Sequence, residues 1–395
     1  MKFDTLIIGG GHAAFLLSKA LRKHGYRGSI GILNGQDQAP YQRPLVSKQP
    51  WTFGQGDGKT ALMPASLIEA LGLTVLQARA RCLQPQERRV VIQAQTGMAT
   101  LDYENCVLAT GARPQQLDMP SGRVNTRAKL LSVYDAEDAM ALTPFLKTGV
   151  SIAVIGGGIL GLEVAAAANA AGARVELLER QDRLLQHLLP SACSEHLRSW
   201  HQNTGLKVVT ACGAITLIEE GNDLLLTAVS GHHARPDLIV TSLGTRANTE
   251  LASDTALHVD DGFLVDHSGQ TNIAHLYALG DCARFPSGHG GYYRSACLSD
   301  VSVQASLLCS TLVHGAAIAH PENRLRTTVS QQGKLLLQLA WSSAFHAPYR
   351  TRTDRLFDAQ ESGMTGLISH DGQPVLLASI NDPRQHLAAR KELDC

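Results

Sequence analysis

Two glycine-rich stretches carry the residue types that could bind a phosphorylated ligand, and they begin at Gly9 and Gly156. The second is the more complete, because it reads G-x-G-x-x-G. The first glycine of such a pattern permits a tight turn, the second lets the main chain approach a pyrophosphate, and the third lets a helix pack against a strand. The phosphates then meet main-chain N–H groups at the positive end of the helix dipole. The spacing predicts a dinucleotide site formed by Gly156, Gly158, Ile159 and Leu160.

A carboxylate follows this turn at the distance expected of a ribose-binding residue. Glu179 comes directly after the next predicted strand. It could accept hydrogen bonds from both hydroxyls of an adenosine ribose, and its charge would repel a 2′-phosphate. The pattern therefore favours NADH over NADPH, although Arg180 and Arg183 follow at once and could soften that preference.

The first glycine stretch has the same organisation with a weaker ribose end. Gly9, Gly11 and Ala14 fill the three small-residue positions. Asn34 and Gln36 lie where an acid is expected, and we assign Gln36 as a neutral partner of a ribose hydroxyl. One glycine turn could serve packing alone, but two in full context predict two bound nucleotides. Such a pair suggests a relay between two cofactors.

The elements that must position these turns are readable from hydrophobic runs. Each turn lies between a buried strand and a helix ended by glycine, and further apolar strands at 106–108 and 276–279 flank the second nucleotide unit. The first domain is therefore interrupted and completed later. We predict an α/β chain with two Rossmann-like, three-layer nucleotide-binding domains, one inserted in the other, and a small α+β C-terminal domain. The expected bounds are 1–117 with 242–320, then 118–241, then 321–395.

Composition sets limits on the function. Lys plus Arg and Asp plus Glu each number 35 in 395 residues, so no net charge points to nucleic acid or to an anionic membrane. No apolar stretch reaches transmembrane length, and the first strand begins too early for a leader, so we expect a soluble, cytoplasmic protein. Eight scattered cysteines without C-x-x-C exclude a zinc ribbon or a cysteine-ligated cluster, and we predict no metal site.

Several motifs occur in order along most of the chain. They are GGGHAA at Gly9, PYQRPLVSK at 40–48, LATGARP at 108–114, GGGILGLEVA at Gly156, LGTRANTEL at 243–251, IAHLYALGDCA at 273–283, and INDPRQHLAARKEL near the end. Through these motifs the chain resembles the FAD-dependent ferredoxin and rubredoxin reductases of the pyridine nucleotide-disulphide oxidoreductase superfamily.

The resemblance implies that FAD occupies the first fold and NADH the inserted one, with the C-terminal domain packed over the flavin. Along the FAD pyrophosphate it implies Gly9, Gly11, His12, Ala13 and Ala14, and at the ribityl chain Asp281. The further FAD-site residues that it implies are Gln36, Arg43, Lys48, Ala80, Thr110, Gly111, Arg113 and Leu298.

Two residues are implied to act in catalysis. A cation at Lys48 would stabilise reduced, anionic flavin, and the alternative is a solvated surface lysine. Glu163 would pair with Lys48 or hold the nicotinamide carboxamide, and the alternative is an acid that complements the helix dipole. The resemblance implies that NADH reduces FAD, which then supplies a small acidic ferredoxin or rubredoxin that feeds an oxygenase.

Departures from the family leave the electron acceptor open. Ala296 and Leu298 occupy positions where ferredoxin reductases often carry Glu and Trp. No cysteine precedes Cys82, which argues against the thiol chemistry of the disulphide- and peroxide-reducing relatives. The alternatives are an NADH oxidase, a small-molecule or quinone reductase, and a redox-sensing flavoprotein of the apoptosis-inducing-factor type.

The segment 321–357 is basic in an otherwise neutral chain. A basic face there would steer an acidic carrier, and the alternative is an ordinary solvated surface. The residues concerned are Arg324, Arg326, Lys334, Arg350, Arg352 and Arg355, against Glu322 and Asp354.

Overall fold

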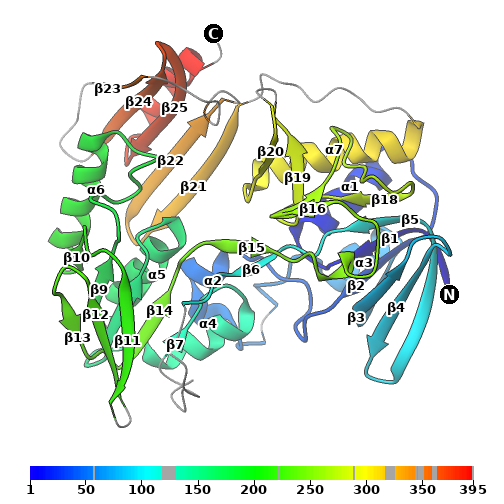
Figure 1. Cartoon of the computed structure of the whole chain (residues 1–395), viewed down its shortest axis with the longest axis horizontal. Helices are drawn as coiled ribbons and strands as arrows, with labels where there is room; N and C mark the ends of the chain where they lie inside the picture. Colours follow the sequence, from blue (N-terminus) through cyan, green and yellow to red (C-terminus); the bar gives the residue numbers. More distant parts are fainter. Residues whose placement is uncertain are drawn as a thin grey trace. The chain divides into compact units, whose positions relative to one another are not determined.

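Contacts divide the chain into two compact units (Figure 1). The structure, a computed structural model, describes residues 1–56, 58–117, 130–220, 223–287, 290–315, 325–342, 345, 351–357 and 363–393. The first unit comprises Met1–Arg43, Asp57–Arg113 and Thr245–Glu322, and the second comprises Pro44–Gly56, Pro114–Gly244 and Asn323–Cys395. The three-domain division predicted from the sequence has different bounds, and it stays a prediction.

The first unit is built on a parallel sheet. Its strand order is β3-β2-β1-β5-β18, and helix α1 packs beside helix α7. The apolar end of strand β1, Leu6 to Ile8, is buried within this sheet, whereas α1 buries one face through Ala14, Leu17 and Leu21. The elements are β1 (Lys2–Ile8), α1 (His12–Lys23), β2 (Ile30–Asn34), α3 (Ala65–Ala70), β3 (Leu73–Gln84), β5 (Gly97–Leu108), β18 (Leu276–Ala278) and α7 (Leu298–His314).

Strands β3 and β5 extend beyond the parallel sheet and also pair with an antiparallel strand. The later half of β3 and the earlier half of β5 pair with β4 (Arg89–Ala94) in an antiparallel meander. Smaller sheets complete the region. They are formed by β6 (Ala112–Pro114) with β15 (Thr245–Ala247), and by β16 (Val259–Asp260), β17 (Gly262–Leu264), β19 (Ala283–Pro286) and β20 (Tyr292–Arg294).

The second unit repeats the parallel arrangement. Its sheet has the order β10-β9-β8-β14-β7, with α5 joining β8 to β9, and an antiparallel meander β11-β12-β13 follows. The predicted α/β class with two Rossmann-like folds is confirmed. The elements are β7 (Leu130–Leu131), β8 (Ser151–Ile155), α5 (Ile159–Ala170), β9 (Arg174–Leu178), α6 (Ser191–Asn203), β10 (Lys207–Val209), β11 (Ile215–Glu220), β12 (Asp223–Ala228), β13 (His233–Ala234) and β14 (Leu238–Thr241).

The second unit also contains a C-terminal antiparallel sheet of order β21-β22-β25-β24-β23. Helix α5 contacts β21, and α6 contacts β24 and β25 (Figure 1). The elements are β21 (Arg326–Gln332), β22 (Leu335–Trp341), β23 (Arg352–Leu356), β24 (Met364–His370), β25 (Gln373–Ile380), α8 (Pro383–Ala389) and η6 (Arg390–Leu393). The second unit also includes four short helices: α2 (Leu45–Lys48), η1 (Pro50–Thr52), α4 (Ala136–Leu142) and η3 (Thr143–Phe145). The short helix η4 (Glu250–Ala252) belongs to the first unit. Within the described residues, no helix is both long and apolar enough to cross a membrane.

Candidate functional site

The glycine turn of the second unit leaves the start of α5 open. Gly156 has φ +107°, and a Cβ there would overlap the main-chain oxygen of Ser242. A Cβ on Gly161 would overlap the oxygen of Gly156, so helix and strand pack closely at that point. Gly158 is the N-cap and makes no side-chain cap, and a Cβ built on it meets nothing within 4 Å. The first N–H groups of α5 therefore face open space that suits a pyrophosphate.

Glu179 is fixed beside this turn by two main-chain donors. Its Oε2 accepts from the N–H of Gly157 at 2.8 Å, and its Oε1 accepts from the N–H of Gln181 at 2.8 Å. Of the two arginines that follow it, Arg180 is exposed and Arg183 is half-buried. The carboxylate thus stands at the end of β9, next to the glycine turn, as a ribose-binding acid must.

The first glycine turn is open in the same way. A Cβ on Gly9, which has φ +121°, would overlap the oxygen of Ala109, whereas one on Gly11 meets nothing within 4 Å. Gly11 is the N-cap of α1, with no side-chain cap and no acid in the first turn. Burial, reinforced by Arg43, lowers the pKa of His12 to about 4, so this side chain is neutral at pH 7. Ala13, next in α1, is half-buried and lies beside Gly280, whereas Ala14 is fully buried in the core of the first unit.

Asn34 is the residue that faces the first turn, and the sequence interpretation favoured Gln36 instead. A Cβ on Gly10 would lie 2.7 Å from Asn34 Oδ1, just as one on Gly157 would lie 2.9 Å from Glu179 Oε2. The Asn34 amide donates to Gln38 O at 2.7 Å and to Gln77 Oε1 at 3.0 Å. The signal was available in the sequence, because Asn34 ends its strand in the same register as Glu179.

Asp281 is brought to the start of α1 by its neighbour Gly280. A Cβ on Gly280 would lie 3.0 Å from the side chain of Ala13, and the Gly280 N–H donates to Gln304 Oε1 on α7 at 2.8 Å. Withdrawal from water raises the pKa of the Asp281 carboxyl, and the charges of Arg43 and Arg294 oppose that rise. The structure therefore gathers Asp281, Arg43 and the first glycine turn in one unit.

Other residues predicted for the first site hold neighbouring loops. Thr110 directly precedes Gly111, and its hydroxyl donates to Asn248 O at 2.7 Å. Arg113 donates to Asn248 Oδ1 at 2.9 Å and forms an ion pair with Glu250. Ala80 is half-buried in β3, and Leu298, at the start of α7, is 46% exposed.

Arg294 anchors the strand before the altered family positions. Its Nε donates to Asp261 Oδ2 at 2.9 Å and its Nη2 donates to Thr245 O at 2.7 Å. The segment that carries Ala296 and Leu298 is thus held, through Arg294, to Asp261 and to strand β15 of the first unit. The Arg294 guanidinium is used in these structural contacts.

Lys48 and Glu163 form an ion pair within the second unit. Lys48 Nζ lies 3.7 Å from Glu163 Oε1 and donates to Val329 O at 3.3 Å. Glu163 is 6% exposed, and its carboxylate accepts from Ser47 Oγ at 2.5 Å and from Ser330 Oγ at 2.7 Å. Burial raises the pKa of Glu163, whereas the Ser47 bond, the Lys48 charge and the Ser330 bond lower it. The sequence interpretation considered Lys48, the nicotinamide carboxamide and the helix dipole as partners of Glu163, and it did not include the two serines.

Four of the six basic residues of the C-terminal segment lie within the described residues, and two of these four, Arg326 and Arg352, make contacts within the fold. Arg326 is buried, and Arg352 donates to Leu189 O at 2.9 Å and to Asp354 at 3.0 Å. These two arginines serve the fold, and the docking role of the segment stays a prediction. Lys334 is exposed, whereas Arg324, Arg350 and Glu322 lie outside the described residues.

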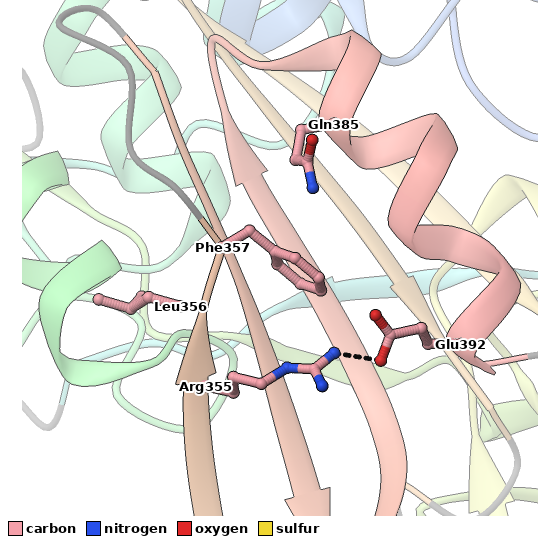
Figure 2. A pocket seen from close by; sticks show the side chains of 5 residues that line it. All are labelled: Arg355, Leu356, Phe357, Gln385 and Glu392. Carbon is pink, nitrogen blue, oxygen red and sulfur yellow. Dashed lines mark hydrogen bonds and ion pairs between the residues drawn. The ribbon is translucent and has the colours of Figure 1, made fainter.

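Arg355 lines a pocket with Leu356, Phe357, Gln385 and Glu392 (Figure 2). Its guanidinium is paired with Glu392 and lies 4.8 Å from the centre of the Phe357 ring. Figure 2 shows Arg355 and Glu392 turned toward one another, so the charge of Arg355 is largely balanced where it stands.

Comparison with known proteins adds three findings. The family model described as pyridine nucleotide-disulphide oxidoreductase matches residues 3–301. A rhodocoxin reductase of Rhodococcus erythropolis is 31% identical over 99% of this chain and 89% of its own length, and a rubredoxin-NAD(+) reductase of Pseudomonas putida is 31% identical over 70% of this chain and 71% of its own. The solved structure of a ferredoxin reductase from Rhodopseudomonas palustris matches with a TM-score of 0.87 at 26% identity, covering 99% of this chain and 95% of that one.

Proposed function

The chain belongs to the pyridine nucleotide-disulphide oxidoreductase family, and on that premise we propose that it is an NADH-dependent FAD flavoprotein that reduces a small ferredoxin or rubredoxin serving an oxygenase. The predicted resemblance to ferredoxin and rubredoxin reductases is confirmed by the relatives. The cytoplasmic location stays a prediction.

The observation that carries this proposal is the pair of open glycine turns on two parallel sheets whose first four strands follow the same order, β3-β2-β1-β5 and β10-β9-β8-β14. Each turn precedes a helix whose N-cap is glycine, with no side-chain cap and no acid in the first turn. A helix start that no side chain satisfies is suited to an anionic ligand. Two such starts support two dinucleotides in one chain.

We assign FAD to the first unit. Its pyrophosphate would lie at Gly9, Gly11 and the following residues of α1, and Asp281 would bind the ribityl hydroxyls. Asn34 joins this set, because its amide faces the middle glycine as Glu179 does in the second unit. A neutral amide there binds ribose hydroxyls without adding charge beside the diphosphate.

The other FAD contacts carried over from the family have uneven support. Arg43 acts electrostatically on both His12 and Asp281, which supports its place in the site. Thr110 and Arg113 already bind Asn248, so they would act mainly by holding the loop that contains Gly111. Ala80 and Leu298 remain proposals from the resemblance.

We assign NADH to the second unit. The pyrophosphate would lie at Gly156, Gly158, Ile159 and Leu160, and Glu179 would bind the adenosine ribose. The Glu179 carboxylate is held by two main-chain N–H groups, so it cannot swing away from a 2′-phosphate without losing both bonds. This supports NADH over NADPH.

Lys48 and Glu163 would set the electrostatics at the reacting end. When bound, FAD would supply the conversion of a two-electron donor into the single electrons that an iron–sulphur carrier requires, and the residues of this chain would set the charge around it. Lys48 supplies a cation that favours arrival of negative charge. Glu163 holds the Lys48 ammonium through the ion pair, while Val329 O accepts from it on another side.

Stopped-flow absorbance tests the proposal. NADH should bleach the flavin of the purified holoprotein, and an acidic ferredoxin or rubredoxin should reoxidise it faster than oxygen does. No bleaching would refute the flavoprotein reductase. Reoxidation fastest by oxygen or a quinone would replace the carrier role with an oxidase or small-molecule reductase. A long-lived reduced flavin that none of these acceptors reoxidises would indicate a redox sensor.

A further inference from the structure

A chain of buried polar side chains leads from Glu163 across the second unit. Ser330 Oγ donates to Glu163 Oε1 at 2.7 Å, and Gln332 Nε2 donates to Ser330 Oγ at 3.2 Å. Gln332 Oε1 in turn lies 2.8 Å from His201 Nε2. All four residues are almost wholly buried. They come from α5, β21 and α6, and α5 contacts β21 directly (Figure 1).

The direction of these bonds is determined by the donors. The Gln332 amide gives its N–H to Ser330, so its oxygen accepts, and His201 must carry a proton on Nε2. Each N–H or O–H therefore points toward the Glu163 carboxylate. Burial lowers the pKa of His201 and so favours its neutral imidazole. The neutral form with its proton on Nε2 can donate to Gln332 Oε1, which makes it the first donor of the chain.

Such a chain matters because Glu163 is a buried carboxylate and its burial raises its pKa. Desolvation disfavours a buried carboxylate, and hydrogen bonds to the charged form oppose that effect. The groups that act on Glu163 are Lys48 and Ser47 on α2 and Ser330 on β21. A neutral Glu163 would leave the Lys48 ammonium without its counter-charge.

We propose that Ser330, Gln332 and His201 are positioning residues whose one-directional hydrogen bonds keep Glu163 ionised and oriented toward Lys48. This proposal rests on the assignment of Lys48 and Glu163 to the reacting end of the site. It extends the functional residues to β21 and α6, which the family motifs do not include. None of the three needs to touch a cofactor, because each acts through its neighbour.

The ionisation of Glu163 can be measured without turnover. Infrared titration of the cofactor-free protein follows the carboxylic-acid C=O band that disappears in Glu163→Gln. Ser330→Ala should raise the midpoint of this band by about 1–2 pH units, since a hydrogen bond to a charged group is lost. Gln332→Leu should raise it by less than about 1 unit and His201→Phe by less again, because each acts through one more bond.

The same order should appear in the holoprotein. The apparent pKa in the pH profile of flavin reduction by NADH should rise in Ser330→Ala and be restored in Ser330→Thr, which keeps the hydroxyl. Ser379→Ala is the matched control, because Ser379 is a buried serine of the same unit that bonds Thr365 and His386 instead. It should leave both readouts unchanged.

The outcomes separate this inference from the proposed function. An unmoved Glu163 midpoint in Ser330→Ala, or an equal shift in Ser379→Ala, overturns the positioning role even if NADH reduces the flavin normally. A shifted midpoint in a protein whose flavin NADH fails to bleach leaves the chain of bonds intact and refutes the reductase. If Ser330→Ala does not fold, Ser330→Thr and Gln332→Leu decide the question by the same titration.

Discussion

Placing a carboxylate at Gly158 should separate nucleotide binding from stability. Gly158 is the N-cap of α5 with φ −71° and ψ 176°, values that any residue adopts, and a Cβ there meets nothing within 4 Å. Gly158→Asp therefore costs no steric strain. Its carboxylate can accept from the free N–H groups of the first turn, which typically adds roughly a few tenths of a kcal/mol to the free energy of unfolding relative to glycine.

The same carboxylate would oppose a bound pyrophosphate. Two like charges about 4 Å apart repel by roughly 4 kcal/mol at an effective dielectric constant near 20. That energy corresponds to a loss of about 10³-fold in NADH affinity. Gly158→Asn is the matched control, because it offers a similar cap and volume without the charge, and it should lose much less affinity.

Two measurements check this prediction. Denaturant unfolding gives the stability of each variant, and calorimetric titration with NADH gives its affinity. We expect Gly158→Asp to be at least as stable as the parent protein and to bind NADH far more weakly than Gly158→Asn does. Unchanged NADH affinity in Gly158→Asp would refute the assignment of this turn to the pyrophosphate, and a marked loss of stability would show that the start of α5 is not open.

Three further predictions follow from the same geometry. Gly161→Ala should lower the free energy of unfolding by about 1–3 kcal/mol or more, because its Cβ would overlap the oxygen of Gly156; a denaturant midpoint equal to that of the parent would contradict this. Glu179→Gln should raise the ratio of kcat/KM for NADPH to that for NADH by about 10–100-fold, since it removes a charge facing the 2′-phosphate, and steady-state kinetics with both cofactors measure that ratio. The pKa of His12 is lower in the folded than in the unfolded protein, so the parent protein should lose stability as the pH falls from 6.5 to about 4. In unfolding curves of the cofactor-free protein, His12→Gln should show a smaller loss of stability over this range. Identical curves for the parent and the variant would exclude the buried neutral histidine.

The glycine turns, the strand and helix around each turn, and Glu179 could be predicted from the sequence because their determinants are local. A buried strand, a glycine turn and a helix lie within about twenty consecutive residues, and each leaves an apolar run or a turn residue in the chain. Asn34 was within reach of the same reasoning. It was passed over because an acid was expected and a later glutamine was taken in its place.

Charge counting was less reliable than motif reading. The basic excess of the C-terminal segment is a property of the sequence, but whether a guanidinium meets solvent or a carbonyl depends on packing. Arg352 satisfies carbonyls before α6, and Arg326 is buried at the start of β21. The sequence contains no sign that separates these two from an exposed cation such as Lys334.

The sequence by itself determined the two Rossmann-like folds, the glycines at their turns and the position of the acid that follows the second turn, because each depends on neighbours along the chain. Only the tertiary structure decided the surroundings of Glu163. Ser47 lies 116 positions before it and Ser330 lies 167 after it, and both reach its carboxylate because α2, α5 and β21 pack together. Hydrogen bonds of that separation leave no period or motif in a single sequence, since any buried serine at the right place in space satisfies them.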